Sequence, residues 1–267
     1  MLPSRYFIDL TQPEIAAQLK KNPLVILPQG SVEQHGPHLP AGTDIFAANV
    51  IAHGVAERMD GLVLPGGPLG VTPIHMPYES TITLTPETYI RVVKETCAST
   101  AQHGAKYLLI LNWHELNIPP LALAADALHR EYGMTVLTVQ ACFVAEEMFG
   151  KECNGLTHGG EIETLAVLAY REELVHLDRI GDSSEQQHAR SMDALRRTRS
   201  YQPVLTDVRS IAPTGWYGTP QHATKEKSHR VMNAIAAAIA TDATEIFQQL
   251  DRVQGGVSEL RKLNRVN

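Results

Sequence analysis

Carboxylate and imidazole side chains gather in one polar segment near the start of the chain, residues 27–44. Glu33 and His35 are two residues apart, so in an extended segment their side chains point the same way, and Asp44 follows nine residues later at the start of a helical pattern. Carboxylate together with imidazole is ligand chemistry that suits zinc or manganese. Taken alone, an E-x-H pattern is more often a polar surface loop whose histidines only form local hydrogen bonds.

Two further polar clusters lie beside other elements. Residues 112–117 (Asn-Trp-His-Glu-Leu-Asn) directly follow the apolar run 107–111, and residues 157–164 (Thr-His-Gly-Gly-Glu-Ile-Glu-Thr) directly precede a helical pattern. Open α/β sheets place their sites in loops at such element ends. We therefore expect the three polar segments to form parts of one site.

These segments resemble the creatininase (creatinine amidohydrolase) family. The first is close to the family's G-S-x-E-Q-H-G-P-H-L-P-x-x-T-D, the second stands in place of N-G-H-G-G-N or N-G-H-Y-E-N, and the third contains H-G-G-E-I-E-T. A late segment, residues 215–224, is similar to the family's G-x-x-G-x-P-x-x-A-T. The resemblance covers roughly residues 20–240. It implies a metal-dependent amidohydrolase that cleaves a non-peptide C–N bond of the cyclic amide or formamide type.

Position by position, the resemblance also implies two divalent metal ions per chain, Zn²⁺ or Mn²⁺. The implied ligands are Glu33, His35, Asp44, His114 and Glu163. In this reading Asp44 bridges the two ions, and His158 is the catalytic residue that transfers a proton. Two divalent ions can hold a hydroxide between them and polarise a carbonyl oxygen, after which an imidazole can protonate the departing nitrogen.

The second polar segment departs from the family pattern. In creatininase an extra Glu lies two residues after the His of this motif, whereas here that position is Leu116 and the acidic residue is Glu115. Trp113 stands where the family usually has Gly, which narrows the expected pocket. Residues 154–157 also lack the aromatic side chain with which creatininase clamps its flat ring. We therefore expect creatinine to be a poor substrate.

Four residues are candidates for substrate binding: Trp113, Glu115, His75 and Trp216. His75 lies in residues 70–81, which resemble a family loop ending in P-G-T. Trp216 stands beside Tyr217 in the late Gly-rich segment, where it could line the pocket or a subunit contact. His38 is expected to order the first polar segment from outside the ligand set.

Length and composition set the frame for this site. At 267 residues and 43% hydrophobic, the chain can bury a core as a single domain, residues 1–267. It has no run of 18 apolar residues and no basic start followed by an apolar stretch, so we expect a cytoplasmic protein without a membrane span. Three cysteines without C-x-x-C spacing argue against a disulfide framework. A net charge of −6 without a Lys/Arg block argues against nucleic acid as a partner.

Helix and strand patterns alternate along the chain. Strands are expected at 24–27, 61–64, 107–111 and 134–140, and helices at about 15–20, 45–59, 85–103, 120–132, 160–173, 184–199 and 225–250. Thr11 with Glu14, and Thr85 with Pro86, are helix start signals. The alternation predicts an α/β fold of three layers, with a mainly parallel sheet and helices on both faces. The resemblance adds the expectation of a homohexamer.

The sequence thus predicts a hydrolase acting on a small-molecule amide or lactam, and three alternatives stay open. One is a lactonase, since the same chemistry attacks esters more readily than amides. Another is an enzyme that trims a small peptide in cofactor maturation. The third is a non-catalytic homologue that keeps the metal, although the presence of His158 with all five implied ligands argues against it.

Overall fold

A parallel sheet of four strands in the order β2-β1-β3-β4 lies at the centre of the protein. The strands are β1 (Leu24–Gln29), β2 (Leu62–Val63), β3 (Tyr107–Asn112) and β4 (Thr135–Gln140). This computed structural model describes residues 2–181, 189, 191–192, 195 and 204–255. β2 lies on one side of β1, whereas β3 and β4 lie on the other, so the strand order changes direction between β1 and β3.

Alternate side chains of the two central strands enter two different hydrophobic cores. Val25, Leu27 and Ile110 lie in one core, and Ile26 and Leu111 lie in the other. All five are at most 1% exposed. Because both faces of a parallel sheet are covered, its strands are near-continuous apolar runs, and this explains why residues 24–27 and 107–111 were recognisable as buried strands.

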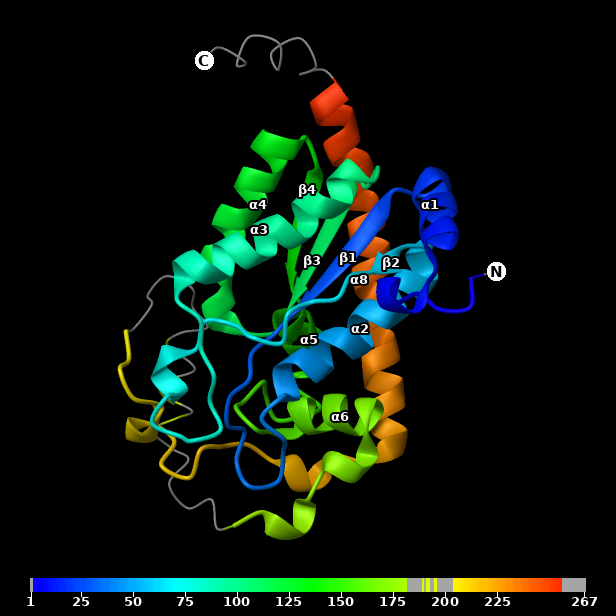
Figure 1. The fold of residues 1–267 in the computed structure, drawn as a ribbon. Coiled ribbons are helices and arrows are strands. Elements are labelled where there is room, and N and C mark those ends of the chain that lie inside the picture. The colour runs from blue at the N-terminus through cyan, green and yellow to red at the C-terminus, as the bar shows by residue number, and fades with distance from the viewer. Residues whose placement is uncertain (1, 182–188, 190, 193–194, 196–203, 256–267) are drawn as a thin grey trace.

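Helices cover both faces, which confirms the predicted three-layer α/β fold (Figure 1). One core is closed by α1 (Gln12–Lys21), α3 (Pro86–Gln102) and α4 (Ile118–Tyr132). The other is closed by α2 (Thr43–Met59), α5 (Ala141–Phe149), α6 (Glu161–Tyr170) and α8 (Lys225–Gly255). The described 3-10 helices are η1 (Phe7–Asp9), η2 (Pro73–His75), η3 (Glu115–Asn117), η4 (Glu172–Leu174), η5 (Leu177–Arg179), η6 (Val208–Ser210) and η7 (Pro220–His222).

Local signals set several helix ends. The Glu14 side chain accepts a hydrogen bond of 2.8 Å from the Thr11 backbone N–H, which forms the capping box expected at α1. The Thr85 side chain accepts a bond of 3.3 Å from the Thr88 backbone N–H at the start of α3. Gly133, in the left-handed region with φ of 70°, ends α4.

Some element boundaries differ from the sequence prediction. Helix α5 was not predicted, because it follows β4 without an intervening Gly or Pro. The helix expected over 160–173 ends at Tyr170, and η4 takes up the rest. The helix expected over 184–199 lies almost wholly outside the described residues. That residues 1–267 form a single domain stays a prediction.

A crevice lies at the point where the strand order changes direction. There β1 and β3 run side by side, with Gln29 paired to Asn112 at their carboxyl ends. Open α/β sheets bind ligands at this point because the loops that leave the two strands diverge to opposite faces. Among the described residues, no helix combines the length and the apolar character needed to span a membrane.

Helices α2 and α8 approach closely behind this crevice, since a Cβ added at Gly54 would lie 2.9 Å from the Cβ of Ala236. We expect Ala236→Leu to overpack the contact and lower the free energy of unfolding by about 1–3 kcal/mol, measured by chemical denaturation. Asn233→Leu on the exposed face of α8 is the matched control and should change it by less than about 0.5 kcal/mol. Equal effects of the two variants would contradict the close contact.

Candidate metal centre

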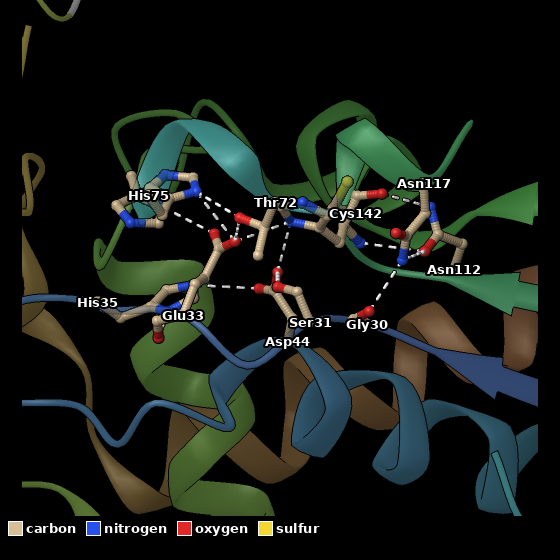
Figure 2. A network of polar contacts seen from close by, with 12 residues as sticks. Gly30, Ser31, Glu33, His35, Asp44, Thr72, His75, Asn112, Asn117 and Cys142 are labelled. Carbon is tan, nitrogen blue, oxygen red and sulfur yellow. Dashed lines mark hydrogen bonds and ion pairs between the residues drawn. The ribbon is translucent and has the colours of Figure 1, made fainter. Parts of the chain in front are cut away.

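All five predicted ligand side chains lie together at the carboxyl ends of β1 and β3. Glu33 and His35 belong to the loop after β1, Asp44 to the first turn of α2, His114 to the segment after β3, and Glu163 to the first turn of α6. Their exposed fractions are between 1% and 7%. Segments far apart in the sequence therefore bury three carboxylates and two imidazoles in one place, and Figure 2 shows Glu33, His35 and Asp44 facing one another there.

Asp44 is the centre of this group. Its Oδ1 lies 3.1 Å from His35 Nε2, and its Oδ2 lies 2.9 Å from His114 Nδ1. The Ser31 hydroxyl donates a further hydrogen bond of 2.8 Å to Oδ2. The two carboxylate oxygens of Asp44 thus contact imidazoles from two different loops.

Gly30 makes this position of Asp44 possible. A Cβ at Gly30 would lie 2.5 Å from the carbonyl carbon of Asp44 and would also clash with the backbone N of Ile45. Only glycine lets the end of β1 come into backbone contact with the first turn of α2. The carbonyl of Gly30 accepts a hydrogen bond of 2.8 Å from Asn117 Nδ2, which ties the same point to the segment after β3.

The donor atoms form two trios that share Asp44, with all atoms of a trio within 4.8 Å of one another. One trio is Glu33, Asp44 and His114, and the other is His35, Asp44 and Glu163. A carboxylate and imidazole donor set of this kind fits zinc or manganese. A third possible trio, Glu33, His35 and His158, competes with the first two for donors. The structure therefore contains clusters of residues that could bind metal ions.

Electrostatics at the site reflect the crowding of carboxylates. Burial, helped by the charges of Asp44 and Glu33, raises the pKa of Glu163 to about 8. Burial alone would lower the pKa of His35, but the charges of Asp44 and Glu163 raise it to about 10. Against the same effect of burial, Glu33 and Asp44 raise the pKa of His114 to about 9. Protons on the imidazoles thus offset the negative charge, which is what a bound divalent cation would otherwise do.

His158 lies beside the trios. The centroid of its ring is 4.3 Å from that of His35, and its Nδ1 is 4.0 Å from Glu33 Oε1. Its Nε2 lies 2.7 Å from the backbone carbonyl oxygen of Gln34. Burial and the nearby His35 and His75 rings lower the pKa of His158 well below its usual value. With Nε2–H donating to the carbonyl, a neutral His158 would present the lone pair of Nδ1 towards the trios.

His75 and Thr72 complete the polar network around Glu33 (Figure 2). His75 Nδ1 lies 3.0 Å from Glu33 Oε2, and the Thr72 hydroxyl donates to the same oxygen. The His75 ring also stacks on His158 at a centroid distance of 4.9 Å. The sequence predicted a substrate-binding role for His75 but did not indicate that it would pair with Glu33. Thr72 was missed, because an isolated Thr carries no signal of its own.

A pocket opens over this group, and three of the four predicted substrate-binding residues line it: Trp113, Glu115 and His75. Its apolar lining residues are Ile74, Leu116, Leu156, Val208 and Ile211. Tyr217 also lines the pocket and was not singled out for this role. The pocket thus combines apolar side chains with convergent polar groups, as small-molecule sites do.

Trp216, the fourth candidate, is not brought to the wall of this pocket. Its side chain is 3% exposed, and its ring meets the edge of the His38 ring at a centroid distance of 5.2 Å. It packs behind the loop that carries Glu33 and His35, against Gly36. The position of Trp216 therefore does not support direct contact with a substrate in this pocket.

A family model described as creatinine amidohydrolase, Creatininase, matches residues 8–242. The chain belongs to the creatininase family. It is 29% identical over 221 residues to a mycofactocin precursor peptide peptidase of Mycobacterium ulcerans (strain Agy99), which covers 78% of this chain and 80% of the relative. It is 30% identical over 196 residues to a creatinine amidohydrolase of Pseudomonas putida, covering 65% of this chain and 75% of the relative.

Solved creatininase structures share the fold. A mutant creatininase of Zn–Zn type superposes with a TM-score of 0.77 at 24% identity, over 92% of this chain and 99% of the other. A structure named creatininase Mn gives a TM-score of 0.76 at 24% identity, over 91% and 99%. The family membership and the metal-binding clusters together make this chain a creatininase-family hydrolase.

Proposed function

We propose that the chain is an amidohydrolase that binds two divalent ions, Zn²⁺ or Mn²⁺, and cleaves a non-peptide C–N bond of a small cyclic amide or formamide-type substrate. The observation that carries this proposal is the pair of donor trios sharing Asp44 at the floor of a pocket. A relative named creatinine amidohydrolase and solved structures named for zinc and manganese support it.

The positions of the residues support the following roles. Glu33 and His114 would hold one ion, His35 and Glu163 the other, and Asp44 both. Bound divalent ions supply Lewis acidity, which lowers the pKa of a water molecule and polarises a carbonyl oxygen.

His158 would move the proton. Two contacts support this role: Nδ1 faces Glu33, from whose side it would take up a proton, and Nε2–H donates to the Gln34 carbonyl, which orients the ring. The same Nδ1–H can then protonate the departing nitrogen.

The apolar part of the pocket lining supports this class of substrate. Leu116, Val208 and Ile211 contribute apolar surface beside the polar groups of the donor trios. A compact, uncharged amide with an apolar part would bury that part against these side chains. Trp113 occupies space that the usual Gly of the family would leave free.

A second candidate is the trimming of a small peptide. It is favoured by the 29% identity to a mycofactocin precursor peptide peptidase over most of both chains. The same donor trios would act on the carbonyl group of a peptide bond in place of that of a small amide. A homohexamer also stays a proposal, which light scattering of the purified protein would test.

We expect two divalent ions per chain on elemental analysis after purification without chelator, and a marked loss of both in Asp44→Asn, because both trios need Asp44. Asp60→Asn, at the other end of α2 and ion-paired to Arg5 and Lys21, is the matched control and should keep the metal. A metal-free protein, or unchanged metal in Asp44→Asn, would rule out the dinuclear site.

His158→Ala should leave the metal content near normal while lowering turnover by roughly 100-fold or more, because it removes a proton-transfer group rather than a ligand. Elemental analysis and steady-state kinetics on the same preparation test both halves. If the variant instead loses metal, His158 is a ligand in the trio with Glu33 and His35.

Creatinine should be turned over at a kcat/KM below about 10⁴ M⁻¹s⁻¹, the lower end for enzymes on their own substrates. The reason is the pocket wall, where Trp113 replaces Gly and residues 154–157 offer no aromatic clamp. The measurement is a panel of cyclic amides, formamides and lactones assayed with the zinc- and manganese-loaded protein. A kcat/KM for creatinine of about 10⁴ M⁻¹s⁻¹ or above would contradict this prediction.

A further inference from the structure

His38 is a buried histidine that the proposed reaction does not use. Its side chain is in none of the donor trios, yet it is 0% exposed. Its Nε2 lies 2.7 Å from the backbone carbonyl oxygen of Gly159. Because a carbonyl oxygen only accepts, Nε2 must carry the hydrogen. Within the described residues, Nδ1 is buried without a hydrogen-bond partner. The ring therefore makes one directional bond, from the loop of Glu33 and His35 to the loop of His158.

Gly159 is held on both sides. Its N–H donates a hydrogen bond of 2.6 Å to Glu163 Oε2, and its carbonyl accepts the bond from His38. Its φ of +66° lies in the left-handed region, and a Cβ there would come within 2.7 Å of the His35 carbonyl oxygen. Glycine is required in this place, and its conformational freedom has to be removed by its neighbours. The two hydrogen bonds do this.

Trp216 closes the arrangement from behind. A Cβ on Gly36, whose φ is +78°, would lie 2.6 Å from the indole ring, so the ring is in contact with the backbone of the first loop. A Cβ on Gly159 would lie 2.8 Å from the Cβ of Trp216. The next residue, Tyr217, donates its backbone N–H to the His158 carbonyl at 2.8 Å. Three loops therefore meet at His38, Gly159 and Trp216.

We propose that His38 is a positioning residue that orients Glu163. Its Nε2–H fixes the Gly159 carbonyl, and this keeps the Gly159 N–H on the carboxylate of Glu163. Glu163 Oε2 in turn lies 3.7 Å from His35 Nε2. The effect of His38 is thus directed at the trio of His35, Asp44 and Glu163. The expected effect of His38 on metal binding rests on the proposed function. The hydrogen-bonded link between the two loops does not.

Substitutions of His38 can either keep or remove the hydrogen-bond donor to Gly159, so their effects can be compared. The amide nitrogen of Gln reaches about as far from the backbone as Nε2 of His, so His38→Gln can keep the donor to Gly159. The amide of Asn ends near the position of Nδ1, and Leu has no donor. His129 is a matched control, because its Nδ1 lies 2.8 Å from the Met134 carbonyl oxygen, far from the site at the end of α4.

The first test is hydrogen exchange on the metal-free protein. We expect residues 157–164 to exchange faster in His38→Leu and His38→Asn than in the native protein, and at the native rate in His38→Gln and His129→Leu. This readout follows the loop itself and needs neither metal nor substrate. Native exchange in His38→Leu, or equally fast exchange in His38→Leu and His38→Gln, would overturn the positioning role.

The second test is a zinc titration against a competing chelator. We expect His38→Leu to weaken one of two binding steps by about 10-fold or more and the other by less than about twofold, with His38→Gln close to native. Equal weakening of both steps, or none, would overturn the directed effect on Glu163. A native protein that binds no zinc would contradict the proposed function instead, and hydrogen exchange would still decide the role of His38.

Discussion

Three carboxylates buried around one point are the constraint on which the rest of this structure depends. Removing even one such charge from water costs several kcal/mol unless it is paired, and mutual repulsion adds to that. The protein offsets the charge with imidazoles on both oxygens of Asp44, with the hydroxyls of Ser31 and Thr72, and with the backbone N–H of Gly159. These partners come from four different loops, so the loops must meet for the carboxylates to be buried at all.

The sheet makes this meeting possible. The reversal of strand order between β1 and β3 separates the loops that follow them, and the two cores on either side fix where those loops begin. The backbone contact between Gly30 and Asp44 then brings the first turn of α2 under the crevice. Because the sheet and its helices fix the ends of the loops, the loops can hold the functional side chains in defined positions.

Short-range patterns in the sequence were enough to predict the central strands and several of the ligand candidates. The ligand candidates Glu33, His35 and Asp44 share one motif, and the buried strands are contiguous apolar runs, so neither depends on knowing the tertiary structure. The family membership that the motifs indicated is confirmed, as is the parallel α/β fold.

Most features that the sequence did not predict depend on contacts between distant segments. The pairing of His75 with Glu33 joins residues 42 positions apart, and no local pattern encodes it. The direction of the Trp216 ring, behind the site and away from the pocket, is set by Gly36 and His38. Helix α5 was missed for a different reason, since nothing in the sequence marks the break from β4.

The donor atoms are spread over a long stretch of chain, from Glu33 to Glu163, a separation of 130 residues. A ribosome-bound chain that ends before α6 therefore has the trio of Glu33, Asp44 and His114 but lacks Glu163, which belongs to the second trio. In the proposed two-ion site, the second trio is complete only after α6 has been synthesised and has packed against α2. For a chain that binds two ions as proposed, capture of the second ion would thus stabilise only chains that have assembled both ends of the site.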